Sequence, residues 1–254
     1  MDQSFDLNNY INHHIMDSYE WNLPFINPIQ LPQILSLHGV MLIIAGMIVF
    51  LLFGVLYNKK KRVPTGMTNL LEMFVLFIRD EIAVNALGKE DGRKMTPLFC
   101  TFFFFILVLN LMGLIPIFST ATANINVTAG LALITLSFMI FGAIYKNGVG
   151  GFFKAVTPSG VPIPVLILLV PIELLGLFIK AFALTIRLFA NMLAGHIVAL
   201  SLLGLVVLIG VAALPAVLLA LFISLLEIFI AFLQAYIFTL LSAMFIGQTY
   251  HPEH

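Results

Sequence analysis

Residues 171–196 read PIELLGLFIKAFALTIRLFANMLAGH, a long apolar run interrupted by Glu173, Lys180 and Arg187. A charged side chain at the centre of a bilayer costs at least about 2.5–3.5 kcal/mol, so such residues usually face protein or water and mark function. The three are spaced seven apart, which keeps them on one helical face because seven residues complete about two turns. Asn191, four residues after Arg187, joins that face. The run predicts a membrane helix with one functional polar face.

The composition of the whole chain also indicates a bilayer environment. Of the 254 residues, 61% are apolar and 9% are charged, whereas a soluble domain carries roughly 25% charged residues. The formal net charge is zero, so charge offers no argument for a nucleic-acid partner. The single cysteine, Cys100, excludes an internal disulfide and a cysteine-only metal site. We expect no cofactor and no metal, and we interpret the histidines near both termini as parts of exposed tails.

The hydropathy pattern predicts an all-α integral membrane protein with about five transmembrane helices and one interfacial amphipathic helix. An exterior N-terminal segment (1–35) precedes a single membrane domain (36–254). The expected elements of that domain are a first span (36–57), the interfacial helix (67–88), two further spans (97–117 and 128–146) and a long, steeply tilted hairpin (163–195 and 215–247). The stretches 88–96 and 147–164 are expected to be loops. The hairpin must tilt because each half of 163–247 would be about 50 Å long as a helix, against a hydrocarbon core of ~30 Å.

The distribution of basic residues predicts the orientation in the membrane. Of the twelve Lys and Arg residues, all but Lys180 and Arg187 lie in the segments that follow the first or the third span. Cytoplasmic loops are enriched in basic residues, so the N-terminus is expected outside and the C-terminus in the cytoplasm. The compact charged loops favour a bacterial plasma (inner) membrane over an organelle inner membrane.

Polar residues of the two hairpin helices fall at matching depths if the chain turns near Val211. Residues at the same level then have numbers that sum to about 422. Three pairs meet this condition: Arg187 with Gln234, His196 with Glu227, and Glu173 with Gln248. Arginine stays protonated in proteins, so titratable groups are expected on both sides of a permanent cation. That arrangement is typical of a transport protein.

Several segments resemble subunit a of the F-type ATP synthase. The similarity is strongest in LTIRLFANMLAGH (184–196) and FLQAYIF (232–238), with support from LNLMGLIP (109–116) and PIELLGLFIKAFALTIR (171–187). The order of elements is similar from about residue 36 onwards. In several bacterial members an aspartate stands where this chain has Gly113, so no channel role is expected for that segment.

The resemblance implies a role for each polar residue. Arg187 is similar to the essential arginine that faces the rotating ring of subunit c, and Asn191 and Gln234 are similar to its polar neighbours. His196 and Glu227 resemble the acid–histidine pair of the exterior half-channel, although their order in the sequence is reversed relative to many bacterial members. That swap preserves the chemistry only if the two side chains touch.

Glu173 is assigned to the other half-channel, whereas Lys180 is given no role in the ion path. Glu173 resembles the acid of the cytoplasmic half-channel, and Lys180 resembles a basic residue often found seven before the arginine. Gln248 joins the ion path through its expected pairing with Glu173. Lys180 could instead simply extend its ammonium group towards an interface.

The function implied by the resemblance is that of a stator subunit of a rotary ATP synthase. It would provide two offset half-channels for an ion, H⁺ in preference to Na⁺, to reach and leave the carboxylates of the c-ring. Its partners would be the c-ring, the peripheral-stalk b subunits and the lipid bilayer. No P-loop pattern is present, so the subunit is expected to be non-catalytic and ATP chemistry to lie in partner subunits.

Three alternatives remain open at the level of the sequence. A secondary transporter could use Arg187 to bind an anionic substrate, but such proteins usually contain two related halves and no repeat is detectable here. A uniporter-type channel would conduct cations poorly past a permanent positive charge. A purely structural membrane subunit would not explain ionisable residues aligned by depth.

Overall fold

The computed structural model describes residues 17–21, 29–32, 35–56, 66–115, 117–157, 162–209 and 214–251. Within these ranges, five helical segments are long and apolar enough to cross a membrane. The all-α membrane fold predicted from the sequence is therefore confirmed. Most of the N-terminal segment, the basic run 58–62, the expected turn at 210–213 and the tail 252–254 lie outside the described residues.

The chain divides into two compact units, and the long helices contribute residues to both. Unit 1 consists of Met1–Leu51, Phe105–Val127 and Arg187–Ala235, and unit 2 of Leu52–Phe104, Thr128–Ile186 and Tyr236–His254.

Unit 1 begins with a short antiparallel pair of strands, β1 (Glu20–Trp21) and β2 (Ile29–Gln30). Helix α2 (Leu37–Leu51) follows, and its buried side chains recur every four residues, which is the spacing of one helical face. This face packs against α4 (Asn85–Gly113) and the short helix η3 (Ala121–Ala123). The buried residues of this cluster are Leu37, Met41, Ala45, Leu109, Met112 and Ala121.

Unit 2 contains the segment expected to be the interfacial helix. Helix α3 (Met67–Phe77) continues into the π-helical segment η2 (Ile78–Val84). Its buried positions, Leu71, Ile78 and Ile82 among them, lie on one side, and exposed residues lie on the other. The segment is therefore amphipathic, and Phe74 stacks on Phe103 of α4 with ring centroids 5.7 Å apart.

The rest of unit 2 is built from helices that follow one another closely. The π-helical turn η1 (Leu52–Leu56) ends the first span. Helix α5 (Ile125–Ser137) passes through η4 (Phe138–Gly142) into α6 (Ala143–Val156). The Thr135 and Ser242 hydroxyls, 3.0 Å apart, link α5 to the last helix, and Phe102 meets Phe238 edge-on at 5.6 Å.

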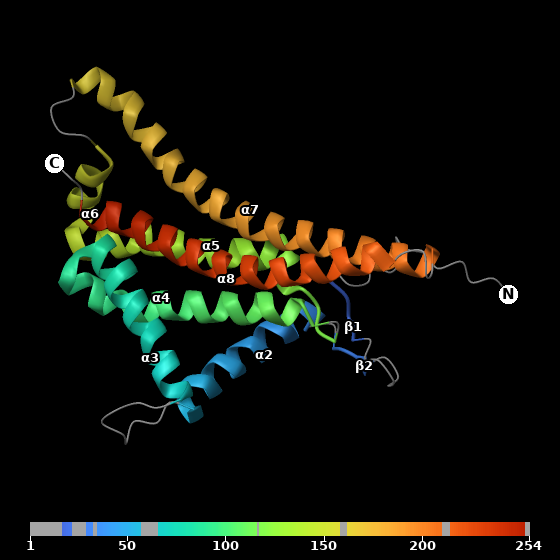
Figure 1. The fold of residues 1–254 in the computed structure, drawn as a ribbon. Coiled ribbons are helices and arrows are strands. Elements are labelled where there is room, and N and C mark those ends of the chain that lie inside the picture. Colours follow the sequence, from blue (N-terminus) through green and yellow to red (C-terminus); the bar gives the residue numbers. More distant parts are fainter. Residues whose placement is uncertain are drawn as a thin grey trace. The chain divides into compact units, whose positions relative to one another are not determined.

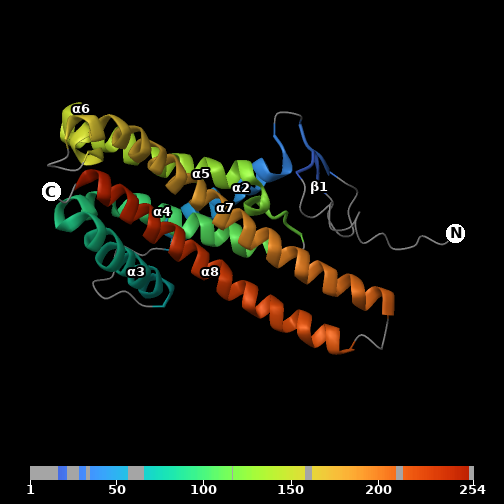
Figure 2. The ribbon, with the colours of Figure 1, turned by 90° about the horizontal axis from the view of Figure 1, so that it is seen from above.

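The hairpin helices are α7 (Ile163–Ile209), with 47 residues, and α8 (Leu214–Tyr250), with 37. At 1.5 Å per residue they are about 70 Å and about 55 Å long, well beyond a hydrocarbon core of ~30 Å. Within unit 1 they lie side by side (Figures 1 and 2). Pro215 occupies the first turn of α8, where its missing N–H needs no partner. Helix α7 continues past residue 195, the expected end, because the residues up to 209 remain apolar and membrane thickness does not itself end a helix.

Two stretches expected to be loops are largely helical. Residues 89–96 belong to α4, which turns sharply at Gly88 (φ 78°) and not at the polar residues that follow. Those residues favour helix, and Lys94 bonds Glu90 one turn earlier at 2.9 Å. Likewise, α6 runs to Val156, and the break falls at Gly148 (φ 72°). Positive φ is accessible to glycine without a steric penalty, so both helices break at these glycines.

Candidate functional site

The two hairpin helices are joined in unit 1 by one amide–amide hydrogen bond. Asn191 Nδ2 donates to Gln234 Oε1 over 2.7 Å. The acceptor, Gln234, is buried at 2% exposure, whereas the donor, Asn191, is exposed. The sequence paired Gln234 with Arg187, so the observed partner lies one helical turn further along α7. The difference arises because matching residue numbers about the turn fixes depth only to within about one helical turn. At that precision the shorter Asn191 side chain makes the contact with Gln234.

Arg187 lies on the outward side of α7. Its side chain is exposed, while the adjacent Leu188 is fully buried. Among the described residues, no acid lies within ion-pairing distance of its guanidinium, and no hydrogen-bond partner of that group is present. The chain therefore presents a permanent cation, one turn from the Asn191 amide, to whatever covers this face.

Glu227 points from α8 towards α7 at the level of His196. Its side chain is 8% exposed, and its Oε1 would lie 2.6 Å from a Cβ built at Gly195. The carboxylate therefore occupies the space left by the missing side chain of Gly195, next to His196 in the chain. A direct contact between the Glu227 and His196 side chains stays a prediction.

The imidazole of His196 reaches the end of α4. His196 Nε2 and Thr120 Oγ1 each lie 3.2 Å from the point that a Cβ at Gly113 would occupy, so these two atoms are at most about 6.4 Å apart. His196 and Thr120 are both buried. The glycine found where relatives were expected to have an aspartate thus leaves room for the histidine and threonine to approach each other.

Sequence reasoning missed two buried polar groups of unit 1. Asn110 is fully buried and donates from Nδ2 to the carbonyl of Ala231, 3.3 Å away. His38, 1% exposed, bonds Ser119 Oγ at 3.0 Å and Asn124 Nδ2 at 2.9 Å. Asn110 could have been found as a lone amide within an apolar run. His38 could not, because Ser119 and Asn124, which its ring contacts, lie more than eighty positions away and no spacing rule links them to it.

In unit 2 the polar contact between the hairpin helices involves Lys180. Its Nζ donates to Gln248 Oε1 over 2.8 Å and lies 5.5 Å from the centre of the Phe245 ring. The sequence paired Gln248 with Glu173 instead. That pairing is wrong in the structure, since Lys180 lies two helical turns closer to Arg187 and its long side chain spans the gap. Glu173 is exposed, and no described residue forms an ion pair or hydrogen bond with it.

No group of three His, Cys, Asp or Glu side chains is placed to hold a metal ion anywhere in the described ranges. His13, His14 and the tail 252–254 lie outside those ranges.

Comparison with known proteins gives consistent results. Residues 39–247 match the model of the family described as "ATP synthase A chain". The chain is 48% identical to the ATP synthase subunit a of Chloroherpeton thalassium, in an alignment that covers 95% of this chain and 77% of that protein. It is 47% identical to the subunit a of Myxococcus xanthus, with 85% and 75% covered. Against the subunit a of Anaeromyxobacter dehalogenans strain 2CP-C the identity is 48%, and the alignment covers 83% of this chain but 56% of that longer relative.

Proposed function

Because the chain belongs to the ATP synthase A chain family, we propose that it is the stator subunit that carries ions to and from the rotor ring of a rotary ATP synthase. Two offset half-channels, one open to each side of the membrane, meet the ring on either side of Arg187. An ion enters by one, neutralises a ring carboxylate, travels with the ring through lipid and leaves by the other.

The exposed, acid-free environment of Arg187 carries this proposal. A guanidinium remains charged at every physiological pH, and leaving it in lipid costs at least about 2.5–3.5 kcal/mol. The described part of the chain supplies no counter-charge, so a partner must. A ring carboxylate that passes this point provides it, and the positive charge favours the ionised form of that carboxylate, which releases its proton.

The side-chain amides of Asn191 and Gln234 fix the hydrogen-bonding groups beside Arg187. The buried end of Gln234 fixes the exposed Asn191 amide through the 2.7 Å hydrogen bond. In this arrangement Asn191 is a neutral hydrogen-bonding group next to the cation. It helps to orient a passing carboxylate without adding a competing charge.

His196 and Glu227 serve the exterior half-channel. Both are buried. Gly113 lies beside His196 and Gly195 lies beside Glu227, so neither neighbour has a side chain that would occupy the adjacent space. A histidine changes its charge near neutral pH and can therefore pass protons on. The carboxylate of Glu227 receives the proton at the ring side.

Glu173 serves the interior half-channel. It is exposed on α7, and Lys180 is held by Gln248 instead of neutralising it. The carboxylate is therefore available to accept a proton from the ring site. Lys180 and Gln248 border this path and set its polarity.

The partners and orientation follow from the same proposal. The c-ring covers the Arg187 face, and peripheral-stalk b subunits hold the chain against rotation. The N-terminus lies outside and the C-terminus in the cytoplasm, as the basic residues after the first and third spans favour. The membrane is a bacterial plasma membrane, in keeping with the bacterial relatives. ATP chemistry lies in the partner subunits, and neither the family nor these relatives support an anion transporter.

The test is Arg187→Ala in the assembled complex in inverted membrane vesicles. ATP-driven proton uptake should be lost, while ATP hydrolysis by the detached soluble head continues. Arg79→Ala is the matched control, because Arg79 is exposed and, within the described ranges, pairs only with its neighbour Asp80 at 2.8 Å. Proton uptake at the normal rate in Arg187→Ala vesicles contradicts the proposed function.

A further inference from the structure

An ionic cluster that has no role in the proposed function so far lies where α8 ends. His251 Nε2 lies 3.0 Å from Asp91 Oδ2 and 2.9 Å from Lys146 Nζ. Asp91 also accepts a hydrogen bond from Lys146, and Lys146 Nζ lies 5.3 Å from the centre of the Tyr250 ring. All four residues belong to unit 2. Helices α4 and α6 are thereby joined to the end of α8.

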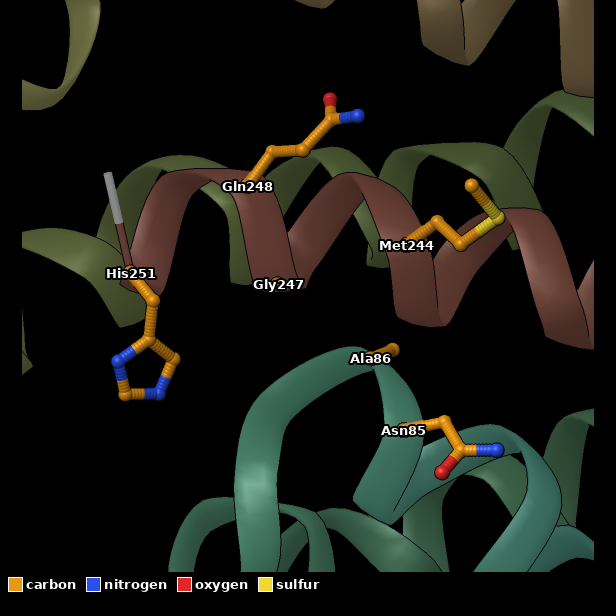
Figure 3. Close-up of a pocket in the computed structure, with 6 residues that line it drawn as sticks. All are labelled: Asn85, Ala86, Met244, Gly247, Gln248 and His251. Carbon is orange, nitrogen blue, oxygen red and sulfur yellow. The ribbon is translucent and has the colours of Figure 1, made fainter. Parts of the chain in front are cut away.

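A pocket of about 410 Å³ lies beside this cluster. Asn85 and Ala86 line one side of it, and Met244, Gly247, Gln248 and His251 line the other (Figure 3). At roughly 30 Å³ per molecule, this volume holds on the order of ten waters. Three of the six lining residues, Asn85, Gln248 and His251, are polar, which suits water better than lipid.

Close backbone packing holds the pocket wall in place. A Cβ at Gly247 would overlap the carbonyl oxygen of Ala86, so only glycine lets α8 approach this closely. Asn147 Nδ2 also donates to the carbonyl of Tyr250 over 3.1 Å. The imidazole of His251 is therefore held by its ionic partners and by a fixed helix end, although its side chain is 53% exposed.

Gln248 connects the pocket to the polar face of α7. It lines the pocket and accepts the hydrogen bond from Lys180. His251 follows three residues later, just past the end of α8, and its side chain points away from that of Gln248 (Figure 3). The pocket thus lies between Gln248, which accepts the hydrogen bond from Lys180, and the half-exposed imidazole of His251.

We propose that this pocket is a water-filled vestibule of the interior half-channel and that His251 is its proton-exchanging residue. The inference rests on the half-channel proposed above. A neutral His251 takes one proton from pocket water, and the imidazolium releases one proton to bulk water. The reverse order supplies protons from bulk water. Each cycle moves one proton and leaves the histidine unchanged.

Charged groups from two other helices lie beside His251. Asp91 on α4 and Lys146 on α6 face the imidazole, and Tyr250 precedes it at the same helix end. Histidine is the side chain whose charge ordinarily changes between about pH 5 and 8.

The test compares His251→Gln with the unmodified complex in inverted vesicles. Glutamine retains hydrogen bonding but cannot carry the proton. ATP-driven proton uptake at about pH 8 in weak buffer should slow by at least about threefold, since the relay is lost where protons are scarce. Added imidazole should restore the rate. Lys89→Gln, at an exposed position of the same unit, is the control and should respond to neither change.

Two results overturn the inference: normal uptake by His251→Gln at every pH, or slow uptake that imidazole does not restore. Arg187→Ala in the same assay separates the two proposals. If it blocks uptake while His251→Gln behaves normally, only the vestibule is wrong. If Arg187→Ala also pumps normally, the proposed function itself fails.

A second measurement tests for water in the pocket. In a Cys100→Ser background, Met244→Cys is treated with a membrane-impermeant thiol reagent from the C-terminal side. It should react at least about tenfold faster than Phe229→Cys, an exposed apolar position of α8, because only a hydrated thiol ionises readily. Equal reactivity at the two positions overturns the vestibule.

Discussion

The carboxylate of Glu227 occupies the space beside Gly195, where a Cβ would come within 2.6 Å of Oε1. Helix α7 has no side chain at the level where α8 carries its buried acid. The Glu227 carboxylate therefore fills the space at Gly195, although the two residues lie 32 positions apart in the chain. The acid reaches the level of His196 only because glycine precedes the histidine.

Gly195→Ala should displace Glu227 and slow ion translocation. The added methyl group overlaps a carboxylate that is 8% exposed, and overpacking of this kind costs about 1–3 kcal/mol. Gly130→Ala is the control, since nothing lies within 4 Å of a Cβ there and alanine favours helix. Thermal unfolding of the purified complex and proton uptake in vesicles measure both effects. Equal behaviour of the two variants would show that Glu227 does not depend on the space at Gly195.

The Asn191–Gln234 hydrogen bond should give a measurable coupling energy. Single changes of either residue to Ala remove the same bond, so the double variant should lose less stability than the two single losses added together. For a hydrogen bond within a membrane protein we expect a coupling of about 0.5–1.5 kcal/mol. Unfolding of the four proteins of the cycle gives the value. Strict additivity would mean that the 2.7 Å contact contributes nothing.

Gly142 and Tyr250 give a prediction about the end of α8. A Cβ at Gly142 would overlap the tyrosine hydroxyl and lie 3.0 Å from its Cζ. Gly142→Ala should therefore destabilise the protein by about 1–3 kcal/mol. In a Tyr250→Phe background the loss should be clearly smaller, because the hydroxyl is gone and only the ring edge remains close. An unchanged loss in that background would place the strain elsewhere.

Composition and apolar run length were sufficient to predict the class of fold. They predicted five apolar spans, and helices α7 and α8 appear where the longest apolar stretch lies. Element ends were less predictable. The polar residues 89–96 resemble a loop by hydropathy, yet their helix propensity and the Glu90–Lys94 pair keep them helical. Only Gly88 and Gly148, with positive φ, interrupt those segments.

Contacts between distant residues required the structure. Periodicity placed Glu173, Lys180 and Arg187 on one face of a helix, but it cannot say which of them the facing helix meets. His38 and Ser119 lie 81 positions apart, and their 3.0 Å contact has no signature in the sequence. The space at Gly195 was equally hidden, because a glycine in a membrane helix has many ordinary explanations.

Thiol cross-linking between α7 and α8 should distinguish the observed pairing from the one predicted from the sequence. In a Cys100→Ser background, the cysteine pair at 191 with 234 should react readily with a short bifunctional reagent. The pair at 180 with 248 should react with a longer one, because the long Lys180 side chain spans the gap in the native protein. The pairs 187 with 234 and 173 with 248 should react poorly. Position 173 lies seven residues from 180, which places it about 10 Å further along α7. Efficient cross-linking of 173 with 248 and not of 180 with 248 would restore the original register, and Glu173 would then be paired with Gln248.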